Sequence, residues 1–256
     1  MSDIIEPSRL TFRQRLLAGE RLLGSFIKTP TSHSVEILGD IGFDFVVIDE
    51  EHAPFDRATI DVAVLAARAA ATAALVRVSS EATILSALDC GADGILVPHV
   101  ANVAKAKSVA AASRYRNGTR GYSPSGRSGR YGGDVLWPYI DRSDRRVTTI
   151  AMIEDPSALE EIDAIVAVDG IDGFFVGRGD LTLALNAKSS SSAEVTSAVE
   201  RVTTAAKAVG KPVMVMTGAR EEGDSFAAMG ATAFILSSDQ GFIRKAGMQM
   251  LQAFRS

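Results

Sequence analysis

Short apolar segments recur along the chain and predict buried strands. Four of them follow a glycine and two turn residues: "GFDFVVI" from Gly42, "GADGILV" from Gly91, "GIDGFFV" from Gly170 and "GATAFIL" from Gly230. Four more bring the strand candidates to eight: "LLGSFIK" (22–28), "AALVRV" (73–78), "TIAMIE" (149–154) and "PVMVMT" (212–217). Apolar runs without alternation are typical of parallel sheets, in which both faces are covered.

Segments with the apolar spacing of helices separate these strands, at 34–40, 56–71, 81–89, 101–113, 156–167, 193–209, 220–229 and 239–254. The four glycines stand where a helix is expected to end before the next strand. Asp155 and Pro156 mark the start of the 156–167 helix. Eight strands alternating with eight helices predict an α/β fold, a (β/α)8 TIM barrel forming a single domain over residues 1–256. A doubly wound open sheet is the alternative, but no G-x-G-x-x-G motif follows the first strand.

One long segment breaks this alternation. "RYRNGTRGYSPSGRSGRYGGD" (114–134) is rich in glycine and serine and contains five arginines before its first acidic residue, Asp134. Long loops without secondary structure in compact domains are usually functional or disordered. Three interpretations stay open for it: capture of an anionic substrate, contact with a neighbouring subunit, and a flexible surface loop.

Composition narrows the class of protein. A formal net charge of −4 and an aromatic content of 6% argue against a nucleic-acid binder, which usually has a basic surplus or stacking platforms. No apolar run approaches the roughly 20 residues that span a bilayer, and the N-terminus lacks the apolar centre of a signal peptide. The single cysteine, Cys90, is expected to be a buried structural thiol. These features favour a cytoplasmic protein without membrane or nucleic-acid partners.

Polar residues end several of the predicted strands. In a TIM barrel the active site lies at the carboxyl ends of the strands, so these residues are expected to share one rim. They are Asp49, Glu50, Glu51 and His52 after the second strand, Arg77 in the third, His99 after the fourth, Glu154 after the fifth, and Arg178 and Asp180 after the sixth.

Glu154 and Asp180 predict a metal site. They are about one βα unit apart in the sequence, which puts their carboxylates on neighbouring strand ends. A site made only of oxygen ligands favours a hard divalent ion such as Mg²⁺ or Mn²⁺. The alternative is structural: Glu154 faces the helix that Asp155 caps, and Asp180 caps the next helix.

Arg77 and His52 predict anion binding and proton transfer on the same rim. A buried arginine requires an anionic partner, either the carboxylate of Glu50 or Glu51, or a developing oxyanion or substrate carboxylate. Carboxylates next to His52 can orient its imidazole as a base.

The sequence resembles the HpcH/HpaI family of metal-dependent (class II) pyruvate aldolases over nearly its whole length. The motifs that support the resemblance are "IDEEHAPFD", "RGYSPSGRSGRYG", "IEDP" and "GRGDLT", in this order. The resemblance implies that Glu154 and Asp180 bind the metal ion, with Co²⁺ as a further candidate beside Mg²⁺ and Mn²⁺. It also implies that His52 is the catalytic histidine, that Asp49 orients it, and that Arg77 contacts the keto oxygen of the substrate.

The resemblance implies substrate-binding residues as well. Backbone N–H groups of Gly179 and Asp180 are expected to bind the substrate carboxylate, and Pro124 and Ser125 to contact the substrate from the long loop. Glu51 is expected to hold Arg77 or a water molecule.

Three departures from the family pattern bear on the substrate. Met152 stands where a glutamine commonly precedes the metal-binding glutamate by two residues, and "GRGDLT" in place of "GPADLS" is expected to put Arg178 beside the metal. The loop has Ser123-Pro124-Ser125 where some members have a glycine–serine pair.

The activity implied is that of a carbon–carbon lyase. It would reversibly cleave 4-hydroxy-2-oxo acids to an aldehyde and pyruvate or hydroxypyruvate through an enolate. No lysine ends a strand as a Schiff-base candidate would (Lys28 is the nearest), which favours a metal ion as the electron sink. A citryl- or malyl-CoA lyase-like enzyme is the alternative and would need a CoA site; a non-catalytic binding barrel would predict damaged site residues.

The resemblance also implies an assembly. Members of the family form homohexamers, trimers of dimers whose subunits exchange the last helix, here 239–254.

Overall fold

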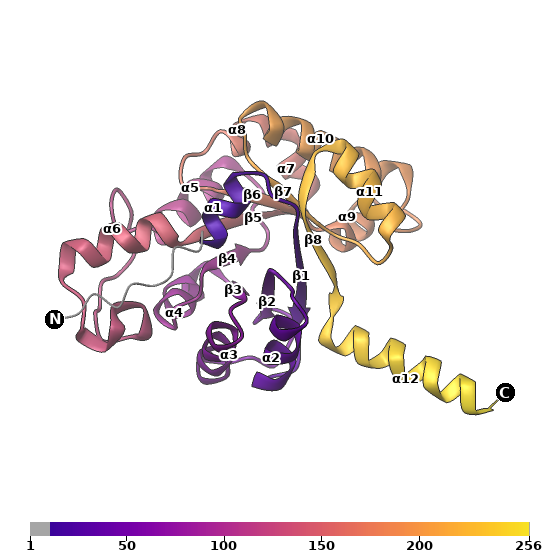
Figure 1. Cartoon of the computed structure of the whole chain (residues 1–256). Coiled ribbons are helices and arrows are strands. Elements are labelled where there is room, and N and C mark those ends of the chain that lie inside the picture. Colours follow the sequence, from indigo (N-terminus) through magenta and orange to yellow (C-terminus); the bar gives the residue numbers. More distant parts are fainter. Residues whose placement is uncertain (1–10, 256) are drawn as a thin grey trace.

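The computed structural model describes residues 11–255 and contains a closed barrel of eight parallel strands in sequence order (Figure 1). The strands are β1 (Leu22–Ile27), β2 (Phe45–Asp49), β3 (Ala73–Arg77), β4 (Gly94–Val97), β5 (Thr148–Ile153), β6 (Gly173–Val176), β7 (Val213–Met216) and β8 (Ala231–Ser238). All eight predicted strands are present, and β8 pairs with β1. The predicted TIM barrel is therefore confirmed, and the open sheet is excluded.

Six of the predicted helices surround the barrel: α2 (Ser32–Asp40), α3 (Arg57–Ala69), α4 (Ile84–Asp89), α5 (Val103–Ala112), α10 (Ala193–Ala208) and α11 (Arg220–Met229). The last predicted helix is α12 (Asp239–Arg255). A short 3₁₀ turn, η1 (Glu81–Thr83), precedes α4. The predicted 156–167 helix is two short helices, α7 (Pro156–Glu160) and α8 (Ile162–Val166), because the backbone leaves the helical conformation at Glu161. The glycines that begin the four quoted strand segments all have φ between +86° and +115°, a conformation that disfavours other residues.

Three helices were not predicted: α1 (Phe12–Leu17), α6 (Leu136–Arg146) and α9 (Arg178–Ala184). Helix α1 lies at the amino end of the barrel, where the buried side chains of Phe12 and Leu16 pack in one apolar cluster with Phe45 from β2. The first helix therefore closes the end of the barrel that faces away from the predicted active site.

Strand residues alternate between two apolar layers. Phe26, Val47, Leu75, Met152 and Phe175 belong to the cluster that fills the barrel, whereas their neighbours in the strands pack against the helices. Because the side-chain period of a strand is two, the residue two positions after each of these also points into the barrel, at its carboxyl end. This alternation decides which strand-end residues can meet.

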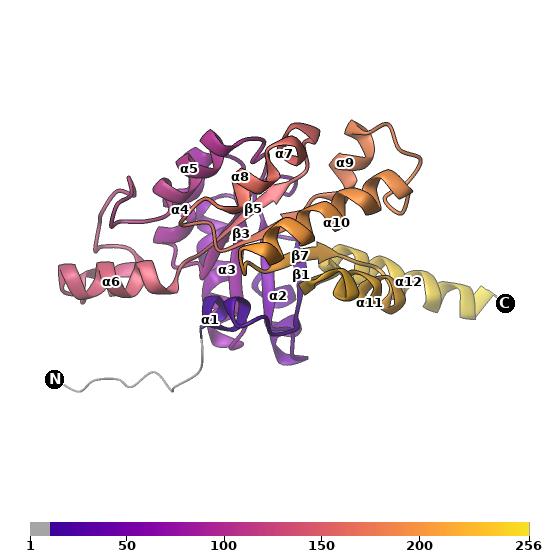
Figure 2. The same ribbon diagram turned by 90° about the horizontal axis from the view of Figure 1, so that it is seen from above.

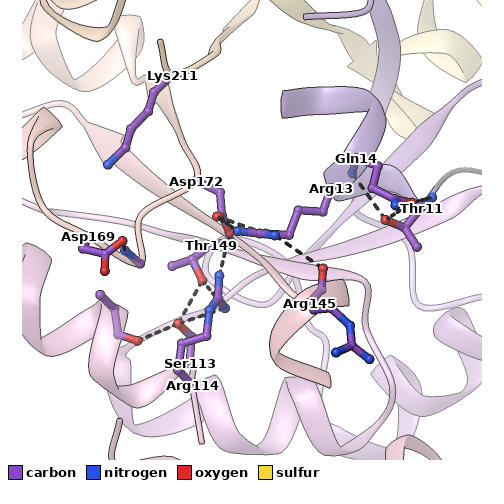
Figure 3. Close-up of polar contacts among 12 residues, drawn as sticks. Thr11, Arg13, Gln14, Ser113, Arg114, Arg145, Thr149, Asp169, Asp172 and Lys211 are labelled. Carbon is purple, nitrogen blue, oxygen red and sulfur yellow. Dashed lines mark hydrogen bonds and ion pairs between the residues drawn. The ribbon is translucent and has the colours of Figure 1, made fainter. Parts of the chain in front are cut away.

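A buried carboxylate ties three segments together at the amino end of the barrel. Asp172 precedes β6 and accepts hydrogen bonds from Arg13 of α1 (2.7 Å) and from Arg114 (2.7 Å), which follows α5. It also accepts a bond from the backbone N–H of Thr149 in β5, as Figure 3 shows. Two guanidinium groups on one carboxylate link α1 to the barrel.

The 114–134 segment is anchored to the rest of the fold. Its five arginines all form ion pairs, and residues Arg127–Gly132 form a short 3₁₀ segment, η2. The pairs are Arg114–Asp172, Arg116–Asp141, Arg120–Asp89, Arg127–Asp61 and Arg130–Asp134. Arg114, Arg116, Arg120 and Arg127 bind carboxylates outside the segment, whereas Arg130 binds Asp134 within it.

The last helix stands apart from the barrel. Helix α12 projects away from the other elements, on the opposite side from α6 (Figures 1 and 2). Ile243, Met250, Leu251 and Phe254 of α12 are all exposed, and Phe254 is 84% exposed. Within residues 11–255, no helix is long and apolar enough to cross a membrane.

Candidate active site

Strand register brings three charged residues together at the carboxyl end of the barrel. Asp49 is the direct cross-strand neighbour of Arg77 in the β2–β3 pair. Lys28 follows Ile27, which pairs with Ile48 of β2. All three side chains therefore point into the barrel from adjacent strands.

The carboxylate of Asp49 is fully buried and binds both cations. It accepts hydrogen bonds from Arg77 Nε (2.9 Å) and Nη2 (2.7 Å), and its Oδ2 lies 2.8 Å from Lys28 Nζ. Burial alone would raise the pKa of Asp49, but the hydrogen bonds from Arg77 and Lys28 lower it below its ordinary value. Asp49 is thus a fixed negative charge that holds the Arg77 guanidinium in one orientation.

The outer edge of the Arg77 guanidinium faces Glu51. Arg77 Nη1 lies 3.3 Å from Glu51 Oε2, and the guanidinium stacks 4.8 Å from the centre of the Phe26 ring. This contact agrees with the expected role of Glu51 in holding Arg77.

His52 lies at the solvent side of this group, with 58% of its side chain exposed. Its backbone N–H donates to Asp49 Oδ1 (3.2 Å), whereas its ring Nε2 lies 3.7 Å from Glu51 Oε2. The expected orientation of the imidazole by Asp49 is therefore corrected: Asp49 binds the main chain of His52, and Glu51 is the carboxylate near the ring.

Glu154 and Asp180 meet at the other side of the rim. Glu154 follows β5 and is 2% exposed, and Asp180 lies in the first turn of α9, after β6. The two carboxyl groups are close enough for Asp180 to influence the pKa of Glu154. Burial, and then the charge of Asp180, raise the pKa of Glu154 to about 7. Two carboxylates in such contact repel each other unless a proton or a cation lies between them.

The main chain around Glu154 is shaped closely to its carboxylate. A side chain at Gly177 would have its Cβ 2.8 Å from Glu154 Oε2 and 2.7 Å from Met152 Cε. Only glycine fits between β6 and α9 without displacing Glu154. Met152, where a glutamine was expected, is buried inside the barrel and leaves this wall of the site apolar.

His99 lies beside Glu154 on the rim, and the sequence analysis gave it no role. Its backbone N–H donates to Glu154 Oε1 (2.8 Å), and its ring Nδ1 lies 3.4 Å from Glu154 and 3.3 Å from Asp155. Burial would lower the pKa of His99, but the charges of Glu154 and Asp155 raise it. His99 also has φ = +52°, an uncommon backbone conformation of the kind found at functional sites.

The Glu154–Asp180 pair fits a divalent cation. Within residues 11–255 no group of three or more His, Cys, Asp or Glu side chains forms a complete metal cage. Two carboxylates without further protein ligands leave coordination positions for water and substrate, as a catalytic Mg²⁺ or Mn²⁺ site requires. The raised pKa of Glu154 gives the same indication, because a cation would replace the shared proton.

Arg178 lies beside Asp180 in the sequence but binds elsewhere. Its Nη1 lies 2.6 Å from Glu222 of α11, and its guanidinium stacks 4.6 Å from the centre of the Phe226 ring. The expected place of the Arg178 guanidinium beside the metal carboxylates is therefore corrected. Gly179 is exposed in the first turn of α9 and has open space around it. The N–H groups of a first helical turn have no acceptors within the helix.

Pro124 and Ser125 lie outside the rim of their own chain. The segment that holds them packs on the C-terminal end of α4: a Cβ on Gly126 would lie 2.9 Å from the carbonyl of Asp89. Ser125 is exposed and bonds to Ser123 (2.8 Å). The structure does not bring these two residues to Glu154, Asp180 or Arg77.

The comparisons with known proteins agree with this geometry. The family model described as HpcH/HpaI aldolase/citrate lyase matches residues 22–246. The chain is 33% identical over 259 residues to 5-keto-4-deoxy-D-glucarate aldolase of Enterobacter sp. (strain 638), with 100% of both chains covered.

Solved structures give the same result. An HpcH/HpaI aldolase/citrate lyase family protein from Burkholderia cenocepacia superposes with a TM-score of 0.90 at 27% identity, covering 95% of this chain and 98% of that one. The citrate synthase SbnG superposes with a TM-score of 0.87 at 30% identity, covering 96% and 98%. Members of the matched family are generally dependent on a divalent metal ion. The predicted class, a carbon–carbon lyase of the aldolase type, is confirmed, and the chain belongs to the HpcH/HpaI aldolase/citrate lyase family.

Proposed function

We propose that the protein reversibly cleaves 4-hydroxy-2-oxo acids to an aldehyde and a pyruvate-type 2-oxo acid, pyruvate or hydroxypyruvate. The observation that supports this proposal most is that the rim carries an anionic pair of carboxylates on one side and a cationic guanidinium on the other. The Glu154–Asp180 carboxylates suit a cation, and the Arg77 guanidinium, fixed by Asp49, suits an oxyanion. A 2-oxo acid, with adjacent keto and carboxylate oxygens, matches both.

We propose Mg²⁺ or Mn²⁺ as the metal ion, held by Glu154 and Asp180. When bound, it would supply Lewis-acid polarisation of the 2-oxo group. The protein's own residues account for the remaining steps.

Arg77 would donate hydrogen bonds to the keto oxygen as negative charge develops on it, and this is the largest electrostatic demand of enolate formation. Its orientation costs nothing at the moment of reaction, because Asp49 and Glu51 already hold it. The N–H groups of Gly179 and Asp180, at the exposed start of α9, would bind the substrate carboxylate.

His52 would move the proton. In cleavage it accepts the proton of the C4 hydroxyl, the C3–C4 bond breaks, the aldehyde leaves, and the bonding electrons form the enolate. The enolate is then protonated at C3. The exposed imidazole, with Glu51 on one side, can exchange protons with substrate and solvent.

Lys28 has a different role from a Schiff-base lysine. Its Nζ lies 2.8 Å from the buried carboxylate of Asp49, so the amine is held in an ion pair instead of facing a substrate carbonyl. In the proposed mechanism, Lys28 therefore stabilises the negative charge of Asp49 through this ion pair.

Sugar-acid derivatives are the substrate class that we favour. The relative from Enterobacter is a 5-keto-4-deoxy-D-glucarate aldolase, and its whole length aligns with this chain. The exposed apolar stripe of α12 and the distance of Ser125 from its own rim support a homo-oligomer, proposed as a hexamer, in which another copy covers α12. A buried lone thiol at Cys90 supports a cytoplasmic location.

The test is proton–deuterium exchange at C3 of pyruvate and hydroxypyruvate, followed by NMR. We expect exchange with Mn²⁺ or Mg²⁺, its loss with EDTA and in Glu154→Ala, and a strong decrease in His52→Ala. An Arg201→Gln variant, changed on the surface of α10, should behave as the wild type. Lack of exchange with either acid and every metal would overturn the proposal.

A citryl- or malyl-CoA lyase-like activity is the second candidate, because the citrate synthase SbnG is 30% identical to this chain. Incubation with citryl-CoA and malyl-CoA separates the two. Cleavage of a CoA thioester without turnover of 4-hydroxy-2-oxo acids would favour this candidate.

A further inference from the structure

A cavity lined by arginines lies away from the rim at the carboxyl ends of the strands. It has a volume of about 420 Å³ and is enclosed by α3, α4, η2 and α6. Gly91 and Ala92, which precede β4, and Val147, which precedes β5, form part of its wall. The cavity is therefore at the amino-terminal side of these strands, opposite to Glu154 and Arg77.

Five arginines line this cavity, and among the residues of the described chain no carboxylate does. Two of them, Arg127 and Arg130, come from the 114–134 segment, whose arginine excess the proposed catalytic site does not use. The five are Arg68, Arg127, Arg130, Arg142 and Arg146. We refer to this space as the arginine cavity.

Four of these arginines pair with aspartates that do not line the cavity. Arg127 binds Asp61 (2.5 Å), Arg130 and Arg142 both bind Asp134, and Arg146 binds Asp93 (3.1 Å). A guanidinium has five N–H donors in a planar fork, and one ion pair uses only part of them. Arg127 and Arg142 therefore have N–H groups that these ion pairs do not use.

One of these donors is buried without a partner. The Arg127 side chain is 9% exposed, and its Nε makes no hydrogen bond. Buried N–H groups are usually satisfied, and an unsatisfied one in a cavity of this size indicates a missing acceptor.

Hydroxyl groups extend the set of donors. Ser128 Oγ accepts a hydrogen bond from Tyr139 (3.0 Å), and Ser143 Oγ accepts one from Arg120 (3.0 Å). Each serine keeps its own proton for another acceptor. Donors from guanidinium and hydroxyl groups on several sides suit a tetrahedral oxyanion better than a planar carboxylate.

The backbone of the wall is held in an uncommon conformation. Arg130 and Tyr131 both have φ = +55°, the left-handed region that residues with a Cβ rarely occupy. Strain of this kind collects at ligand-binding segments, where the surrounding structure maintains it. Arg127 and Arg130 of this segment both line the cavity.

We propose that the arginine cavity binds a small phosphate-bearing anion with two or more negative charges. Its volume is within the range of small-ligand pockets, about 300–1,000 Å³. This site is separate from the aldolase site and needs no metal ion. The ligand would join α3, α6 and η2, and would steady the segment that carries Ser125.

Isothermal titration calorimetry of the full-length, EDTA-treated protein with inorganic pyrophosphate tests the proposal, at an ionic strength held constant with NaCl. We expect one pyrophosphate per chain, with citrate binding at least tenfold more weakly. The double variant Arg68→Gln/Arg130→Gln should lose at least tenfold in affinity, because both side chains line the cavity and Arg130 is 63% exposed, so that folding should persist.

The matched control is Arg21→Gln/Arg201→Gln, which removes two arginines of similar exposure that lie outside the cavity. It should keep the wild-type affinity. Equal losses in both double variants, or an absence of pyrophosphate binding in the wild type, would overturn the proposal. Citrate binding as tight as that of pyrophosphate would overturn the assignment to phosphate.

A second measurement uses the wild type alone. Phenylglyoxal modifies accessible arginines, and mass spectrometry locates the modified peptides. Pyrophosphate should slow the modification of Arg68, Arg130 and Arg142 relative to Arg21 and Arg201. Uniform rates with and without pyrophosphate would contradict the site even if the variants failed to fold.

Discussion

At the scale of single residues, the proposed metal site depends on a glycine as much as on its carboxylates. Gly177→Ala would bring a Cβ within 2.8 Å of Glu154 Oε2 and displace the carboxylate. Displacing groups that orient a metal ligand typically reduces metal affinity or activity by about 10–100-fold. We expect a loss of this size in Mn²⁺ affinity and in the rate of pyruvate exchange.

Gly179→Ala is the matched control for that change. Gly179 is two residues further on, has open space around it, and keeps its backbone N–H when it becomes alanine. Its Mn²⁺ affinity should remain close to that of the wild type. Equal effects of the two substitutions would show that the close fit of Gly177 against Glu154 is not what matters.

The pKa of Glu154 predicts how pH affects the metal-free protein. Since its pKa is about 7 in the folded state and 4.5 in the unfolded reference, the folded state binds more protons between these values. The contribution of Glu154 protonation to the free energy of unfolding is fully present below pH 4.5 and is lost as the pH rises through about 7. It amounts to about 3 kcal/mol at most.

Urea unfolding of EDTA-treated protein at pH 5 and pH 8 measures this contribution. The wild type should lose more free energy of unfolding between the two pH values than Glu154→Gln, whose amide does not titrate. Adding Mn²⁺ should stabilise the wild type more at pH 8, where no proton competes for the carboxylates. Parallel pH profiles of the two proteins would contradict the prediction.

The sequence allowed the charged groups of the rim to be found, but not all of their contacts. Asp49, Arg77 and Glu154 follow apolar strands at the inward-pointing positions, so their convergence could be expected. Lys28 follows β1 by the same rule, and His99 follows β4, but their contacts depend on strand register and on a left-handed backbone at His99. Those details arise from tertiary structure.

At the scale of elements, α12 carries an apolar stripe without a cover. Ile243, Met250, Leu251 and Phe254 recur at the spacing of one helix face, and all are exposed. Leu251→Asp/Phe254→Asp should lower the oligomeric mass measured by light scattering, because charged groups in an apolar interface lose hydration.

Gln249→Asp/Gln252→Asp adds the same charge to the other face of α12 and should leave the mass unchanged. If both double variants keep the wild-type mass, the stripe does not form an interface between subunits.

The elements that the sequence analysis missed share a physical cause. Helix α9 has seven residues and α1 has six, too short for apolar periodicity to be recognised. Helix α6 contains few apolar residues, and two of them, Leu136 and Trp137, are exposed. Long periodic segments such as α10 were predicted almost to the residue because their buried stripes repeat over several turns.

At the scale of the whole molecule, Asp172 links the first helix to the barrel (Figure 3). Asp172→Ala would leave Arg13 and Arg114 without their carboxylate at a largely buried position. Removing one partner from a buried ion pair costs about 3–5 kcal/mol. We expect a decrease of that order in the free energy of urea unfolding.

Asp163→Ala provides the comparison, because Asp163 is 80% exposed and pairs with Arg201 at 3.6 Å. Exposed pairs contribute about 0–1 kcal/mol. A decrease below 1 kcal/mol for Asp172→Ala would mean that α1 is held mainly by its apolar contacts.

The uneven distribution of charge around the rim has a consequence for enzyme engineering. The charged groups proposed for the chemistry lie at the ends of β1 to β6, whereas Gly218, just after β7, has open space around it and a backbone conformation without positive φ. Side chains of increasing size at Gly218 could therefore narrow the entrance for the aldehyde without disturbing Asp49, Arg77 or Glu154. The same barrel could be tuned to different aldehydes at one position while the chemistry of the 2-oxo acid stays constant.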